Sequence, residues 1–181
     1  NGRLILGLGA GWNEVEFRAF GFPYDRRVAR FEEAFQIITT LLRDGHIDFE
    51  GQFYQARDCE LLPRGPRPNG PPIILGAKGP RMLRIGLAHA DGWNAWHTLF
   101  DNDPDNLGPL MSKIDDVCRQ VGRPPAEVDR HVAALVELTG AKGRIAGDAK
   151  KRGVRPLPGN PERLAQAELP GSLGSMFLAK P

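Results

Sequence analysis

A glycine-rich turn with two cations is the first candidate for chemistry in this chain. Gly76-Ala77-Lys78-Gly79-Pro80-Arg81 follows the apolar run Ile73–Leu75 and precedes an apolar repeat with helical spacing. Small residues let a ligand approach the backbone, and a helix start offers unpaired N–H groups and the positive end of its dipole. The turn therefore fits a phosphate group. A plain strand-to-helix turn with two solvated cations fits the same residues.

A second glycine-rich turn closes the first apolar run of the chain. Leu4–Leu8 is followed by Gly9-Ala10-Gly11-Trp12. The last glycine of a dinucleotide-binding fingerprint would fall at position 12, which is tryptophan, so the Rossmann match fails. The glycines leave room for a flat ring against the backbone, and Trp12 offers an aromatic wall. A purely structural turn is the alternative.

Aromatic residues gather at the end of a third apolar segment, Gly92–Trp96. Alternation along a strand places Trp93 and Trp96 on opposite faces, so one indole should face inward and the other outward. Trp93 is a candidate for lining a ring pocket, with core packing as the alternative. His97 has the chemistry to shuttle a proton or bind phosphate, and a bystander role is the alternative.

Other catalytic and metal-binding motifs are missing from the sequence. The remaining histidines have no metal-ligand spacing, and HExxH, CxxC and GxSxG do not occur. We therefore predict no metal site and no serine nucleophile.

Composition limits the class of protein. With 181 residues, of which 41% are apolar and 25% charged, the chain is typical of a globular domain. The net charge is 24 − 22 = +2, too small to indicate nucleic-acid binding. No apolar run approaches about 18 residues, so no membrane span is expected. Cys59 and Cys118, without a secretory leader, favour reduced thiols in the cytoplasm.

The elements that must position these turns alternate between strand and helix. Apolar spacing predicts a helix from Asp25, as its cap, to Gly45, a hairpin near 46–57, and further helices after Pro80 and from Leu107 to Gly122. The expected strands are Leu4–Leu8, Ile73–Leu75, Gly92–Trp96 and His131–Thr139. Such alternation predicts an α/β fold with a parallel sheet, either doubly wound or a (β/α) barrel. In both, functional groups collect at the carboxyl ends of the strands.

The last part of the chain differs in composition. Six basic residues face one acid between Lys142 and Arg155 without interleaved aromatics, which predicts a solvated loop. A short helix near Asn160 and an irregular tail follow. We therefore divide the chain into a barrel part, 1–139, that includes the hairpin, and a tail, 140–181.

Five ordered blocks carry a resemblance to a known family. The sequence resembles the luciferase-like monooxygenases, and within them the branch that uses the deazaflavin coenzyme F-420. The blocks are Gly2–Trp12, Phe17–Gly21, Arg30–Ala34, Phe49–Tyr54, and Pro71–Arg81 together with Ala90–Asn94.

The resemblance implies a partial TIM-type (β/α) barrel that holds about strands four to seven of eight, and hence an internal fragment. It implies a cofactor cradle made by Ala10, Gly11 and Trp12 and by the Gly76–Arg81 turn, with Trp93 nearby. The implied activity is hydride transfer between the deazaflavin and a small organic substrate, with a homodimer as the candidate assembly. The proton-transfer residue would lie in the other half of the barrel.

Alternatives remain within and outside this class. The same phosphate turn would accept FMN, which implies a monooxygenase. A catalytically inactive barrel fragment that only binds phosphate or self-associates is the other alternative. Sugar-phosphate dehydrogenases of the branch carry a glutamate where this chain has Trp12, which argues against sugar-phosphate oxidation.

Overall fold

Four parallel strands form the sheet of this molecule. The computed structural model describes residues 2–135, and the predictions for 136–181 lie outside them. The strands are β1 (Leu6–Leu8), β4 (Ile73–Leu75), β5 (Gly92–Trp96) and β6 (Asp129–Ala133), hydrogen-bonded in the order β1-β4-β5-β6. Because neighbouring strands are parallel, their carboxyl ends lie at one edge. The predicted parallel sheet is therefore confirmed.

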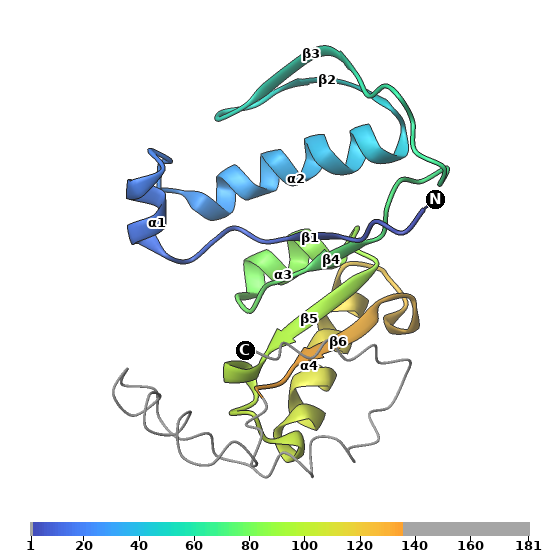
Figure 1. Cartoon of the computed structure of the whole chain (residues 1–181). Coiled ribbons are helices and arrows are strands. Elements are labelled where there is room, and N and C mark those ends of the chain that lie inside the picture. Colours follow the sequence, from blue (N-terminus) through green and yellow to red (C-terminus); the bar gives the residue numbers. More distant parts are fainter. Residues whose placement is uncertain (1, 136–181) are drawn as a thin grey trace, which may run out of the picture.

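Helices cover one face of this sheet (Figure 1). The covering helices are α2 (Arg27–Arg43), α3 (Pro80–Leu87) and α4 (Leu107–Gln120), with short 3-10 turns at His97–Leu99, Pro104–Asn106 and Pro125–Glu127. The short helix α1 (Glu14–Ala19) follows β1 and has no buried residue. Leu75, Trp93 and Ala95 point to the helices and are fully buried, together with Leu83 and Ile114. None of the helices in the described part of the chain has the length and apolar character that a membrane crossing would need.

The opposite face of the sheet is open within residues 2–135. Side chains on this face alternate with the buried ones, and Ile74, Asn94 and Trp96 are exposed or half-buried, whereas Ala133 beside Trp96 is buried. Trp96 is 48% exposed, whereas Trp93 is 0% exposed. The predicted split of the two indoles between the faces is therefore confirmed.

The start of α2 differs from the prediction. Arg26, not Asp25, is the N-cap, with a φ of 50° in the left-handed region and no side-chain cap hydrogen bond. Asp25 lies one residue too early to cap the helix. It accepts a hydrogen bond from Arg30 Nε through its main-chain oxygen at 3.1 Å, and its carboxylate lies 3.6 Å from the same guanidinium. The segment before it also contains α1, which the apolar spacing did not predict.

A hairpin packs on α2, on the side away from the sheet (Figure 1). Its strands are β2 (His46–Glu50) and β3 (Gln55–Glu60). The Glu33 carboxylate on α2 accepts hydrogen bonds from the main-chain N–H groups of Gln52, Phe53 and Tyr54, at 2.8, 2.8 and 3.0 Å. One carboxylate thus binds the hairpin loop to the helix.

We expect Glu33→Gln to destabilise the protein in a pH-dependent way. Burial raises the pKa of Glu33, but the three N–H donors and Arg30 outweigh it, so the pKa lies below the ordinary value of 4.5. A lowered folded-state pKa gives stability that is complete above pH 4.5 and is lost as the pH falls through the lowered value. The gap in Tm between the native protein and the variant should be largest at pH 7 and should narrow in acid.

Circular dichroism melts at several pH values would measure this gap. Glu60→Gln on the exposed edge of β3 is the matched control and should leave Tm unchanged. A gap that stays constant down to pH 3 would contradict the role given to the ionised carboxylate.

Candidate functional site

The two glycine-rich turns meet at the carboxyl edge of the sheet. Gly76 N–H donates to the Leu8 carbonyl oxygen at 2.8 Å. A β-carbon built at Gly9 would lie 3.0 Å from the Gly76 carbonyl oxygen, so any larger residue at position 9 would crowd the neighbouring turn. The structure therefore brings together the turns that the sequence singled out separately.

The turn after β4 leaves the N-terminus of helix α3 accessible. Gly79 is the N-cap of α3, with φ −76° and ψ 144°, and Pro80 occupies the first helical position. No side chain caps the helix. A β-carbon built at Gly79 would meet no heavy atom within 4 Å, so space for a ligand is present above this residue.

Two contacts hold this turn in place. The indole N–H of Trp93 donates to the Ala77 carbonyl oxygen at 2.8 Å. Arg81 pairs with Glu32 of α2 at 2.5 Å, so its charge is already compensated. Lys78, by contrast, has no ion pair with a carboxylate of residues 2–135. Lys78 is therefore the cation of the turn that is available for an anion.

The turn after β1 has a backbone that only glycine suits. Gly11 has φ +72°, and a β-carbon there would lie 2.6 Å from the Phe17 ring. Trp12 is 82% exposed, and its carbonyl oxygen accepts a hydrogen bond from the Tyr24 hydroxyl at 3.2 Å. Within the described residues Trp12 therefore presents a free aromatic face, as its predicted role as a ring wall requires. That role stays a prediction.

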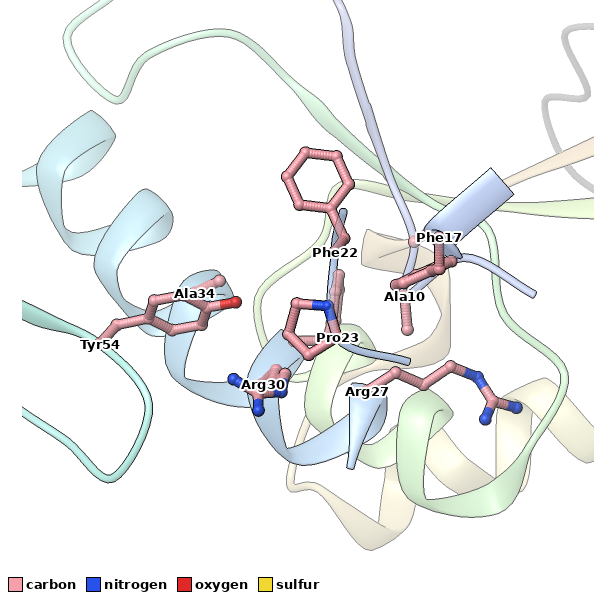
Figure 2. Close-up of a pocket in the computed structure, with 10 residues that line it drawn as sticks. Ala10, Phe17, Phe22, Pro23, Arg27, Arg30, Ala34 and Tyr54 are labelled. Carbon is pink, nitrogen blue, oxygen red and sulfur yellow. The ribbon is translucent and has the colours of Figure 1, made fainter. Parts of the chain in front are cut away.

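A pocket of about 180 Å³ lies beside this turn, between the α1–α2 segment and the hairpin (Figure 2). Ala10 lines it with Gly9 and with aromatic and basic side chains from α1, α2 and the loops. Phe17, Phe22 and Tyr54 are among its aromatic residues, and Arg27 and Arg30 its basic ones. Ala10 thus lines this pocket and also belongs to the turn at the carboxyl edge.

The open face carries polar residues that sequence reasoning missed. Asn94 of β5 and His131 of β6 are register partners on this face, and both are half-buried. A β-carbon at Gly92 would lie 3.0 Å from His131 Nε2, which places the imidazole over β5. The signal that could have found this pair is the parallel register of the two strands, which aligns Asn94 with His131.

His97 lies at the same edge, after β5. Its ring centre is 5.0 Å from that of Trp96. Burial lowers the pKa of His97 below its ordinary value of 6.5, so the imidazole is neutral at pH 7. Among residues 2–135 no group of three or more histidine, cysteine, aspartate or glutamate side chains is arranged to bind a metal ion.

The described residues therefore supply places to bind and orient a ligand. A phosphate fits the turn at Gly79 and Lys78, and a planar group fits the small residues between the two turns. Among residues 2–135, Asn94 and His97 are polar side chains near the carboxyl end of β5.

Comparison with known proteins identifies the class to which this geometry belongs. The sequence profile of the family described as luciferase-like monooxygenase matches residues 1–139. The chain is 33% identical over 115 residues to the 5,10-methylenetetrahydromethanopterin reductase of Archaeoglobus fulgidus, covering 62% of this chain and 33% of that protein. It is 34% identical over 136 residues to the F420-dependent glucose-6-phosphate dehydrogenase of Intrasporangium calvum, covering 72% and 40%.

A solved structure extends the comparison to the fold. The structure of the monooxygenase RslO1 from Streptomyces bottropensis superimposes with a TM-score of 0.63 at 24% identity, covering 83% of this chain and 46% of that chain. The chain thus spans less than half the length of these relatives. The match confirms the prediction that its strand–helix units are part of a TIM-type barrel. From the profile match over residues 1–139, the chain belongs to the luciferase-like monooxygenase family.

Proposed function

We propose that the protein that carries these residues is an oxidoreductase that transfers a hydride between deazaflavin coenzyme F-420 and a small organic substrate. The observation that carries the proposal is the Gly76–Arg81 turn. It joins a helix start without a side-chain cap, open space at Gly79, and Lys78, which forms no ion pair within residues 2–135. The relatives named as F420-dependent support the choice of coenzyme. Because the chain covers less than half of its relatives, the activity is proposed for the longer protein.

The residues of this chain would bind and orient the cofactor. Lys78 and the N–H groups at the start of α3 would hold its phosphate, and Trp93 and Glu32 would keep that turn in place through Ala77 and Arg81. The backbone of Ala10 and Gly11, with Trp12 at the side, would border the ring. When bound, the deazaflavin supplies the carbon that accepts or donates the hydride.

Polar groups near the ring position would then contact the substrate. His97 is a titratable side chain at this edge, and the His131 imidazole lies over Gly92 on the open face. The lowered pKa of His97 keeps its imidazole neutral at pH 7, so it can accept a hydrogen bond or a proton. We leave the catalytic acid or base unassigned within residues 2–135.

A flavin-dependent monooxygenase is the second candidate. The similarity to RslO1 and to pyrimidine monooxygenases favours it, and the Gly76–Arg81 turn takes the phosphate of FMN as well. We also propose a cytoplasmic protein with a small-molecule substrate and a homodimeric assembly. The absence of a nucleic-acid partner stays a prediction from the small net charge.

Cofactor titration of the full-length protein tests the proposal. We expect purified protein to bind F-420 more tightly than FMN, and substrate to change the cofactor absorbance without oxygen uptake. Tighter binding of reduced FMN with substrate-dependent oxygen uptake would select the monooxygenase. Binding of neither cofactor would refute both oxidoreductase assignments.

A further inference from the structure

A pocket on the helix side of the sheet contains a second cation close to the phosphate turn. It measures about 270 Å³ and lies where the β4–α3 turn, β5 and α4 meet. Lys78 from the turn and Lys113 from α4 both line it. The other lining residues are apolar: Leu83, Trp93, Leu99, Leu110 and Ile114.

The charges of this pocket are unbalanced. Among residues 2–135, no carboxylate lines it. Within residues 2–135, neither Lys78 nor Lys113 forms an ion pair, whereas Arg119 on the same helix pairs with Asp116 at 2.7 Å. Two like charges beside one apolar pocket repel each other, and an anion between them would relieve that repulsion.

The apolar side chains that line the pocket, which we call its floor, and the Gly76–Arg81 turn limit which ligand can bind. Trp93 forms part of the floor and also binds the Ala77 carbonyl oxygen, so the floor and the turn are one rigid unit. Ile114 and Trp93 are fully buried, which keeps this floor in place. An anionic group fits such a pocket at the two lysines, with its neighbouring atoms against the apolar side chains.

We propose that Lys113 is a second phosphate-binding residue, which holds the cofactor phosphate together with Lys78. The proposal rests on the proposed function, because it concerns the same cofactor. The proposal adds to the cofactor site a residue from α4, the helix that follows β5. It also predicts that the phosphate lies toward the helix side of the turn, away from the open face of the sheet.

Binding of F-420 and FMN to the full-length protein tests the role of Lys113. Lys113→Ala should raise the Kd of the cofactor bound by the native protein at least tenfold, because one charge-assisted contact is lost. Lys113→Arg should restore most of the affinity. Arg119→Ala is the matched control, since it removes one positive charge from the same helix outside the pocket, and it should leave the Kd unchanged.

The dependence of the cofactor Kd on ionic strength separates a specific contact of Lys113 from a general electrostatic effect. The Kd of the native protein should rise with ionic strength more steeply than that of Lys113→Ala. An unchanged Kd in Lys113→Ala, or an equal loss in Arg119→Ala, would overturn the proposal. Failure of the native protein to bind either cofactor would instead refute the proposed function.

Discussion

The 181-residue chain, purified by itself, should show no measurable turnover with F-420 or FMN, whereas the full-length protein should work at ordinary enzyme rates of about 1 to 10³ s⁻¹. The physical reason is the open face of the sheet. Trp96 is 48% exposed there, and Leu4 and Ile5 before β1 are 65% and 56% exposed. A ring bound at this edge would face water on one side, and water would weaken the electrostatic contacts that orient it.

A lack of turnover could arise from an incomplete active site or from an unfolded chain, and the assay must distinguish the two. Circular dichroism should show helix and strand in the purified chain, and size-exclusion chromatography should report its association through the edge strands β1 and β6. The full-length protein in the same buffer is the positive control. Turnover above about 1 s⁻¹ by the isolated chain would show that residues 1–181 hold a complete site.

Gly79→Phe in the full-length protein should weaken cofactor binding more than tenfold, that is by more than about 1.4 kcal/mol. The backbone at position 79 has φ −76° and ψ 144°, which any residue adopts before a proline, and the space around it is empty. The ring of phenylalanine would therefore cost little in folding. It would fill the space proposed for the phosphate.

Equilibrium titration and thermal melts of the same samples measure both effects. Gly65→Phe is the matched control, because a β-carbon at Gly65 also meets no atom within 4 Å and the residue lies in the exposed link before β4. It should bind the cofactor as the native protein does. If Gly79→Phe has a native Kd and a native Tm, the phosphate lies elsewhere.

The sequence predicted the sheet and the main helices well because they depend on short-range patterns. Apolar runs marked β1, β4 and β5, and Pro80 marked the start of α3. The fourth strand was predicted at His131–Thr139, but β6 begins two residues earlier and ends at Ala133. The α1 helix was missed because it has no buried residue and hence no apolar stripe. Its cap was readable, however, because Asn13 and Glu16 have the sequence spacing of a capping box. In the structure the Asn13 side chain accepts from Val15 N–H at 3.2 Å and donates to the Glu16 carboxylate at 2.8 Å.

The sequence predicted only those parts of the candidate site that are formed by one short, continuous segment. Both glycine turns could be found because each is a short segment with special backbone needs. Lys113 and Glu32 could not, since they reach the Gly76–Arg81 turn from other helices and nothing near them in sequence indicates a ligand. Arg81 is an example. The sequence suggested that it is a cation for phosphate, but in the structure it forms an ion pair with Glu32, a contact that the sequence did not indicate.

One buried amide also links two segments at the carboxyl edge. Asn102, in the loop between β5 and α4, is 2% exposed, and its side chain forms two hydrogen bonds with the main chain of Leu135 beyond β6. The amide oxygen accepts from Leu135 N–H at 3.0 Å, and the amide nitrogen donates to Leu135 O at 2.9 Å. The side chain thus takes the place that a peptide group of another strand would take.

The two hydrogen bonds between Asn102 and Leu135 have a consequence for local opening of the structure. To expose the loop after β5, the protein must break both hydrogen bonds that the Asn102 amide forms with the main chain of Leu135. The end of β6 loses its partner in the same event. The two segments therefore form one cooperative unit of hydrogen exchange, in which the loop and the strand end open and close together.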